Sequence, residues 1–127
     1  MSVAFNHTIV FGRDRAQAAA FLADVLGLPP PRRFGPFHVV DLANGASLDF
    51  MDAGDHPFTP QHYAFLIGED DFDRIFARIR ERGLEYWADP HKAQPGEINH
   101  HFGGRGVYFD HPDGHLLEVI TRPYGSE

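Results

Sequence analysis

The sequence contains no cysteine, which excludes disulfide bonds, thiolate nucleophiles and thiolate-bound metals. Any metal would therefore be held by the nitrogen and oxygen atoms of His, Asp and Glu side chains. Nine histidines among 127 residues provide ample material for such a site, although composition alone does not demonstrate one.

Basic residues are also scarce, with 11 Lys and Arg against 18 Asp and Glu and a formal net charge of -7. A nucleic-acid-binding chain normally carries a basic stripe, so we expect no nucleic-acid partner. No apolar run reaches the length of a membrane span, and the N-terminus lacks the charged and then apolar pattern of a signal peptide. We therefore expect no membrane association and a cytoplasmic location.

The chain repeats its own pattern. The two halves open with FNHTIVFGRDRAQAAAFLADVLGL and PQHYAFLIGEDDFDRIFARIRERGL. Each contains a polar residue, a His, an apolar strand pattern, an acidic turn, a helical pattern and a closing Gly-Leu. The segment DAGDHPFTP between them is rich in Pro, Gly and Asp, as linkers are. We predict one domain over 1–127, with module 1 over about 4–53, a linker over about 53–60 and module 2 over about 61–122.

The sequence predicts two helices and the residues at which each begins and ends. In the second, the apolar residues Phe72, Ile75, Phe76 and Ile79 follow the i, i+3, i+4, i+7 spacing of an amphipathic helix. Asp14 is the predicted N-cap of the first helix, and Asp70 or Asp71 that of the second. Gly27 and Gly83 lie where a helix is expected to end.

Short strand patterns follow each helix. They are FHVVDL and ASLDFM in the first half, and LEYWAD, GVYFDH and HLLEVIT in the second. Asn44-Gly45 is a strong hairpin signal, and His111-Pro112-Asp113-Gly114 is a turn in which Pro fixes φ and Gly accepts positive φ. The last strands of the two halves align, so that Asp49 and Glu118 hold the same place in each βαββ(β) unit.

Four polar residues of apolar strands are brought into register by the repeat, namely His7, Asp49, His62 and Glu118. We expect His62 on the inward side of its strand, where an ionisable group is costly unless it is paired, hydrogen-bonded or bound to metal. For His62 taken alone, a core histidine with a hydrogen-bond partner is the simpler interpretation, and the carboxylates would be merely exposed if these were edge strands. The shared register favours a metal site.

These motifs resemble the vicinal oxygen chelate superfamily, which includes glyoxalase I, extradiol dioxygenases, fosfomycin resistance thiol transferases and bleomycin resistance proteins. The resemblance covers about Phe5 to Thr121. It is carried by NHTIVF, VLGL, HYAFLI, RGL and VYFDHPDGHLLEVI. It implies an α+β fold of two tandem βαβββ modules, with curved mixed β-sheets around a divalent metal ion.

The resemblance also assigns ligands. It implies that His7, His62 and Glu118 bind the metal, which would be Fe, Mn, Ni, Zn or Co. Asp49 matches a carboxylate position that glyoxalase I fills with Glu, so Asp49 is a candidate fourth ligand or catalytic base. Small members of the family usually form homodimers by module exchange. In such a dimer we expect His7 and Glu118 of one chain to meet the partner's His62.

The loop QPGEINHHFGGRG carries more polar groups than a connection needs. We predict substrate contacts from His100, His101 and Arg105 in this loop and a catalytic role for Tyr108 in the strand that follows. The alternative is a solvated loop without a site. GGRG is not a phosphate-binding loop, because the Lys-Ser/Thr and the following helix are missing.

The predicted function is that of a metal-dependent enzyme of glyoxalase or dioxygenase type, acting on a small oxygen-chelating molecule. Fosfomycin modification is disfavoured because Ile9 replaces the Thr of those transferases, Gly103 to Val107 replace their Ser-rich segment, and a C-terminal Arg is missing. The alternative function is that of a non-catalytic, drug-sequestering protein of bleomycin resistance type. Its groove would be lined by aromatic residues, namely Tyr86, Trp87, Phe102 and Tyr124.

Overall fold

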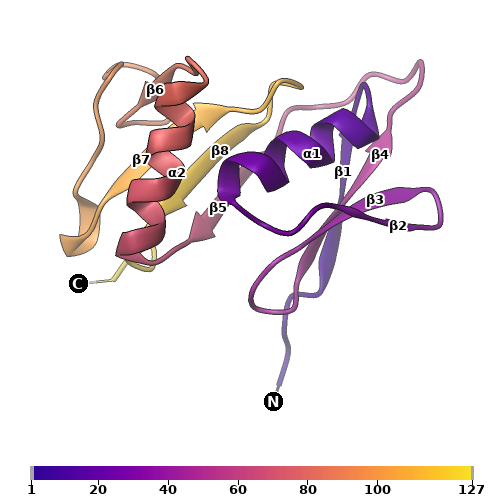
Figure 1. Cartoon of the computed structure of the whole chain (residues 1–127), viewed down its shortest axis with the longest axis horizontal. Helices are drawn as coiled ribbons and strands as arrows, with labels where there is room; N and C mark the ends of the chain where they lie inside the picture. Colours follow the sequence, from indigo (N-terminus) through magenta and orange to yellow (C-terminus); the bar gives the residue numbers. More distant parts are fainter. Residues whose placement is uncertain (1, 127) are drawn as a thin grey trace. The chain divides into compact units, whose positions relative to one another are not determined.

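The computed structural model describes residues 2–126 and divides into two compact units, Met1–Thr59 and Pro60–Glu127. Each unit contains a helix and a four-stranded sheet, which can be followed by colour in Figure 1. Within residues 2–126, no helix is both long and apolar enough to cross a membrane.

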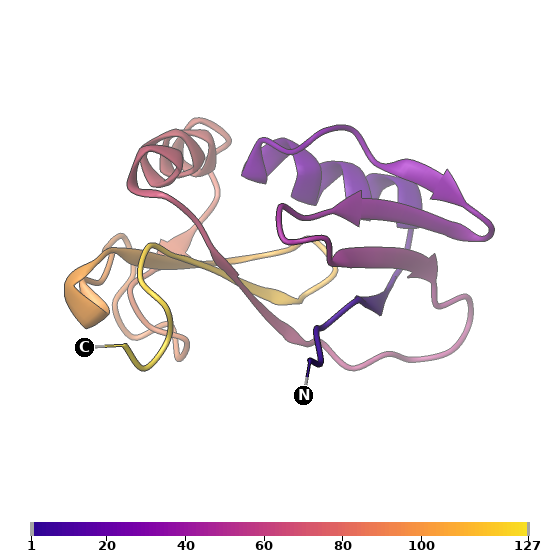
Figure 2. The ribbon, with the colours of Figure 1, turned by 90° about the horizontal axis from the view of Figure 1, so that it is seen from below.

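Unit 1 is a βαβββ module. Its elements are β1 (His7–Gly12), α1 (Arg15–Leu26), β2 (Arg32–Phe34), β3 (Phe37–Asp41) and β4 (Ser47–Asp52). The strand order is β1-β4-β3-β2, with β1 parallel to β4 and the other neighbours antiparallel. The helix α1 lies over one face of this sheet, as Figure 2 shows. The apolar residues of that face are buried, among them Val10, Val40, Leu48 and Phe50.

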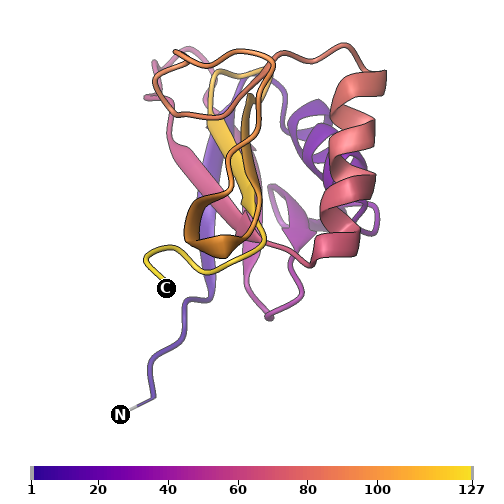
Figure 3. The same ribbon diagram turned by 90° about the vertical axis from the view of Figure 1, so that its left-hand side faces the viewer.

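Unit 2 repeats this plan. Its elements are β5 (His62–Leu66), α2 (Glu69–Glu81), β6 (Tyr86–Trp87), the short 3₁₀ helix η1 (His101–Gly103), β7 (Gly106–Asp110) and β8 (Leu116–Ile120). The order β5-β8-β7-β6 has the same parallel and antiparallel pairs as unit 1. Figure 3 shows α2 running beside the sheet. The predicted α+β fold of two βαβββ modules with mixed sheets is thus confirmed.

The sequence did not indicate β2, because this strand has three residues, all exposed, and therefore no apolar alternation. Both the start and the end of α1 agree with the prediction. Asp14 accepts a hydrogen bond from the backbone N–H of Gln17 at 3.1 Å, and Gly27 ends α1 with φ 70°. Gly83 follows α2 with φ 66°.

The start of α2 differs from the prediction. Its N-cap is Gly68, which makes no side-chain cap hydrogen bond, and the helix begins at Glu69. Asp70 and Asp71 lie in the first turn instead. Carboxylates are also favourable there, because they interact with the exposed N–H groups at the positive end of the helix dipole.

The prediction that His62 faces inward was wrong. In β5 the buried residue is Phe65, whereas His62, Ala64 and Leu66 are exposed. The helix-facing side therefore carries Tyr63 and Phe65, and the imidazole lies on the opposite face of the sheet.

The first strand has the same pattern. In β1 Val10 is buried, and His7, Ile9 and Phe11 are exposed. Two of these are large apolar side chains, with 42% exposure for Ile9 and 43% for Phe11. Both ligand-type histidines thus lie on the side of their sheet that the helix leaves open.

Candidate metal and substrate site

The sheet register places the four predicted polar residues equivalently in the two units. His7 begins β1 and pairs with the first residue of β4, and Asp49 is the third residue of β4. His62 begins β5 and pairs with the first residue of β8, and Glu118 is the third residue of β8. Alternate residues of a strand share a face, so each unit brings one imidazole and one carboxylate to the same side.

In unit 2 these two groups meet. Nε2 of His62 lies 3.0 Å from Oε1 of Glu118, and Nδ1 of His62 lies 3.1 Å from the carbonyl oxygen of Leu116. A carbonyl only accepts hydrogen bonds, so Nδ1 carries a proton and donates it. The lone-pair position of Nε2 is therefore aimed at the carboxylate. Two acceptors this close require a cation between them, either a proton or a metal ion.

Tyr108 completes this cluster. It pairs with Glu118 across β7 and β8, and its ring stacks on that of His62 with centroids 5.9 Å apart. Burial, together with a hydrogen bond to Glu118, raises the pKa of Tyr108 far above its usual value. The phenol therefore stays protonated and donates to the carboxylate. Its chemistry here is that of a hydrogen-bond donor and not of a base.

The His62 and Glu118 pair has the ligand chemistry for a divalent metal but is incomplete by itself. Imidazole nitrogen and carboxylate oxygen suit Mn, Fe, Co, Ni and Zn. Within residues 2–126, no group of three or more His, Cys, Asp or Glu side chains is assembled to hold an ion. The pair therefore fits a metal only when a third donor is added.

The imidazole of His7 is also held by a hydrogen bond. Its Nδ1–H donates to Oδ1 of Asn6 at 2.6 Å, which leaves Nε2 as the free ring nitrogen. A hydrogen bond from the second ring nitrogen is the usual way in which a protein fixes a metal-binding imidazole. His7 and His62 thus both present Nε2, although the bonds that hold their Nδ1 atoms differ.

Asp49 is held differently from Glu118. It is 8% exposed, and its Oδ1 accepts a hydrogen bond from the Ser47 hydroxyl at 2.7 Å. The carboxylate is thus stabilised by a neighbour on its own strand. Its predicted role as a base or fourth ligand stays a prediction.

The expected division of ligands between two chains was wrong in one respect. His62 and Glu118 belong to parallel neighbouring strands of a single sheet, so they meet within one chain. An arrangement in which Glu118 reaches the partner's His62 is inconsistent with this geometry. In a dimer with module exchange, the ligand contributed by the second chain would be His7.

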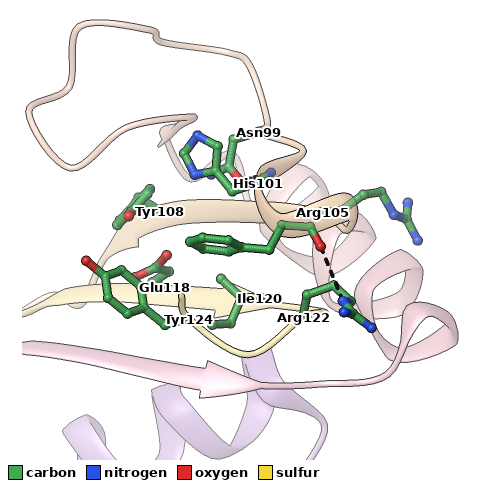
Figure 4. Close-up of a pocket in the computed structure, with 9 residues that line it drawn as sticks. Asn99, His101, Arg105, Tyr108, Glu118, Ile120, Arg122 and Tyr124 are labelled. Carbon is green, nitrogen blue, oxygen red and sulfur yellow. Dashed lines mark hydrogen bonds between the residues drawn. The ribbon is translucent and has the colours of Figure 1, made fainter. Parts of the chain in front are cut away.

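A pocket of about 250 Å³ borders Glu118 and Tyr108, and Figure 4 shows the residues that line it. It is lined by residues of β7, β8, the loop before β7 and the C-terminal segment, namely Asn99, His101, Phe102, Arg105, Tyr108, Glu118, Ile120, Arg122 and Tyr124. A molecule in this pocket would touch both the Glu118 carboxylate and the Tyr108 phenol.

Of the two adjacent histidines in the loop, only one is placed to contact a ligand in this pocket. His101 lines it, whereas His100 is exposed, precedes η1 and is not among the lining residues. The predicted substrate contact of His101 is therefore compatible with the geometry, and that of His100 is not.

Arg105 lines the pocket, but its guanidinium is engaged elsewhere. Nε donates to Glu69 Oε1 and Nη1 to Asp73 Oδ1, both at 2.8 Å, and the group lies 4.4 Å from the ring centroid of Phe72. Figure 4 shows the guanidinium turned away from the pocket. These bonds raise the pKa of Arg105 and lower those of Glu69 and Asp73. The geometry thus gives Arg105 the role of tethering the loop to α2, in place of the predicted substrate contact.

Sequence reasoning missed Arg122 and the structural role of Asn99. Nε of Arg122 donates to the carbonyl oxygen of Phe102 at 3.2 Å, drawn as a dashed line in Figure 4, so an arginine does reach the pocket from the C-terminal segment. Asn99 is buried, donates to the Ala88 carbonyl at 2.9 Å and accepts from the His101 N–H at 3.3 Å. The position of Arg122, two residues after the end of the last strand, was the available signal.

The comparisons with known proteins agree with this architecture. The model of the Glyoxalase/Bleomycin resistance protein/Dioxygenase superfamily matches residues 4–119. The chain belongs to this superfamily. The predicted resemblance is thus confirmed over nearly the whole length of the chain.

Two solved structures match this superfamily domain along its whole length. Oxidase ChaP-H1 is 61% identical with a TM-score of 0.95, over 98% of this chain and 100% of that chain. Oxidase ChaP-H2 is 60% identical with a TM-score of 0.95, over 99% and 98% of the two chains. A curated relative, glutathione transferase FosA of Serratia marcescens, is 27% identical in an alignment 126 positions long that covers 94% of this chain and 81% of that protein.

Proposed function

We propose that this protein is a metal-dependent oxidase that acts on a small molecule able to chelate the metal through oxygen atoms. The observation that carries the proposal is the pair formed by His62 Nε2 and Glu118 Oε1, 3.0 Å apart beside a pocket. The identity of 61% to oxidase ChaP-H1, over nearly the full length of both chains, supports oxidation as the reaction class.

The residues of the pair would hold the metal together with His7. A divalent ion such as Fe or Mn, when bound, supplies a Lewis acid and a redox partner that brings substrate oxygens and O₂ together. His62 keeps its Nε2 lone pair available because its Nδ1–H is held by the Leu116 carbonyl. Tyr108 keeps its proton and donates a hydrogen bond at the carboxylate.

The pocket residues would position the substrate. Phe102 and Ile120 provide apolar walls against which the substrate would pack. His101, which is exposed, would contact the substrate from the open side of the pocket. Dioxygen would be the oxidant and would accept the electrons taken from the substrate.

A homodimer would supply the missing third ligand. The faces that carry the histidines also expose apolar side chains, including Ile9, Phe11 and Leu66, the last at 61%. Large apolar side chains left exposed on the face of a sheet are typical of interaction surfaces. We infer that a second copy of the chain covers these faces and brings its His7 to the His62 and Glu118 pair.

Metal content and oxygen consumption test this proposal. The protein, purified without a metal-chelating tag, is reconstituted separately with Fe, Mn, Co, Ni and Zn, and O₂ uptake is measured with catechol as the probe. We expect about one ion per chain and metal-dependent O₂ uptake. Turnover of lactoylglutathione, or of fosfomycin with glutathione, without any O₂ uptake would replace the oxidase assignment. A preparation that takes up none of these metals would overturn the metal site.

The alternative is a non-catalytic protein that sequesters a small molecule. The pocket supports it with the edge-to-face contact between Phe102 and Tyr124, whose ring centroids lie 5.8 Å apart. The variant His62→Ala separates the two functions. An enzyme would lose metal and turnover, whereas a sequestering protein would keep its affinity for the same probe.

A further inference from the structure

A buried histidine outside the pocket contacts the strand that carries His62. His115 is 2% exposed, and its Nδ1 accepts a hydrogen bond from the backbone N–H of Gln61 at 2.9 Å. Because Nδ1 accepts, the proton of the neutral ring is on Nε2. Gln61 directly precedes His62, so this bond acts on the residue next to the proposed ligand.

The backbone carries the effect to the ligand. The carbonyl of Gln61 accepts from the Leu116 N–H at 2.9 Å, and the carbonyl of Leu116 accepts from Nδ1 of His62 at 3.1 Å. Both backbone groups of Gln61 are thus held by the consecutive residues His115 and Leu116. His62 follows Gln61 in the chain and pairs with Leu116 in the sheet. The orientation of its ring therefore depends on where the Leu116 carbonyl lies relative to β5.

The His115 ring is fixed by its surroundings. Tyr63 packs against it edge-on with centroids 5.7 Å apart, and His111 lies at 5.9 Å. His111 is itself held, because its Nδ1 accepts from the Asp113 N–H at 3.0 Å. A ring that cannot rotate holds its acceptor atom in one place, which is what a precise placement of Gln61 requires.

Unit 1 shows that the fold does not need this imidazole. The residue equivalent to His115 is Ala46, also buried, and the equivalent backbone bond from Ser47 N–H to the Asn6 carbonyl is present at 2.9 Å. There the ligand-type His7 is held by the Asn6 side chain. His115 is therefore an addition to the shared module, found in the unit whose histidine is held by a backbone carbonyl.

We propose that His115 is a positioning residue for His62. By accepting the Gln61 N–H, it fixes the start of β5 against β8, so that the Leu116 carbonyl holds Nδ1 of His62 and Nε2 faces Glu118. The usefulness of this role rests on the proposed metal function. The hydrogen bonds that place the His62 ring are present without metal.

The test compares His115→Leu, which removes the acceptor at similar volume, with His115→Asn, whose Oδ1 can replace Nδ1. In the metal-free protein, nitrogen-15 NMR reports whether Nδ1 of His62 carries a hydrogen-bonded proton. We expect this proton to be retained in wild type and His115→Asn and lost in His115→Leu. In Co(II) titrations, His115→Leu should bind about 10- to 100-fold more weakly than wild type, and His115→Asn about as tightly as wild type.

Two results overturn the proposal. One is an unchanged Nδ1 proton signal of His62 in His115→Leu, and the other is a Co(II) affinity and visible spectrum that this substitution leaves unaltered. If His115→Leu fails to fold, His115→Ala takes its place, because Ala46 occupies the same turn position in unit 1. If the wild type binds no Co(II), the proposed metal function fails, and the NMR comparison still decides the role of His115.

Discussion

Asp49 and Glu118 occupy equivalent positions in the two sheets, yet their carboxylates have different partners. Asp49 accepts a hydrogen bond from Ser47 at 2.7 Å, whereas Glu118 faces Nε2 of His62 at 3.0 Å. The residue of β8 equivalent to Ser47 is Leu116, which has no hydroxyl to offer. The serine thus satisfies one carboxylate locally, and its absence leaves the other to face the imidazole.

The two carboxylates are therefore expected to respond differently to neutralisation. Glu118→Gln removes the charge that faces His62 and should weaken Co(II) or Mn(II) binding by more than about 100-fold. Asp49→Asn keeps the hydrogen bond from Ser47 and should bind the metal as wild type does. Isothermal titration calorimetry measures both. A comparable loss in Asp49→Asn would identify Asp49 as a fourth ligand.

The order of helices and strands could be predicted from the sequence because the same pattern occurs in both halves of the chain. The aligned positions of His7 and His62, and of Asp49 and Glu118, gave a register that the parallel strand pairs reproduce. Local signals such as Asp14 at the start of α1 were equally readable, since a cap depends on residues three positions apart.

What the sequence could not supply depends on contacts between distant elements. Strand alternation shows that His62 and Phe65 face opposite sides, but it does not say which side the helix covers. The position of the Arg105 guanidinium could not be predicted either, because it also depends on contacts with a distant element. Its partners Glu69 and Asp73 are more than thirty positions away, and nothing local distinguishes an arginine that binds a helix from one that binds a substrate.

Mixing of inactive variants tests which chain contributes each ligand. His7→Ala and His62→Ala are each expected to lose the metal. When the two are unfolded together and refolded, a mixed dimer regains one intact site, because the His62 and Glu118 pair is whole in one chain and His7 in the other. Random mixing should restore about a quarter of the wild-type metal occupancy.

The control is a mixture of His62→Ala with Glu118→Gln. Both variants damage the same pair within a chain, so no combination yields an intact site and no metal should return. Recovery in this control would mean that His62 and Glu118 meet between chains. Absence of recovery in the first mixture would mean that His7 joins the pair of its own chain or does not bind.

The hydrogen bonds between Arg105 and α2 should make the stability of the fold vary with pH in the acid range. Hydrogen bonds from Arg105 hold the pKa values of Glu69 and Asp73 below their ordinary values of 4.5 and 3.8. A carboxyl whose pKa is lower in the folded state stabilises the fold above its unfolded pKa, and this contribution is lost as the pH falls through the folded pKa. We expect Arg105→Gln to lower the melting temperature at pH 7, with the difference from wild type shrinking as the pH falls below about 4.

The matched control for the tether is Arg74→Gln. Arg74 pairs with Asp71 at 2.9 Å, and its side chain is 61% exposed. The acidic partners are exposed in both cases, but the Arg105 side chain is only 27% exposed and bonds to two carboxylates. Exposed pairs of neighbouring helix residues contribute little. An equal loss at pH 7 in the two variants, or a loss in Arg105→Gln that does not vary with pH, would show that Arg105 acts through packing on Phe72 alone.

Gly104 is expected to be the least replaceable residue of the loop that borders the pocket. A Cβ at this position would overlap Oγ1 of Thr121 and lie 2.6 Å from Cγ of Arg122. Thr121 accepts the backbone N–H of Arg105 at 2.8 Å, and Arg122 lines the pocket, so neither can move without disturbing the site. Gly104→Ala should therefore destabilise the protein by about 1–3 kcal/mol and weaken binding of probes in the pocket.

Gly68→Ser provides the comparison for this substitution. A Cβ there would meet only Oδ2 of Asp71 at 3.5 Å, an ordinary contact, and serine is a favoured N-cap residue for α2. Chemical denaturation followed by circular dichroism should place Gly68→Ser within about 0.5 kcal/mol of wild type. If Gly104→Ala were equally stable and kept its probe affinity, the contact of this glycine with Thr121 and Arg122 would have no part in shaping the pocket.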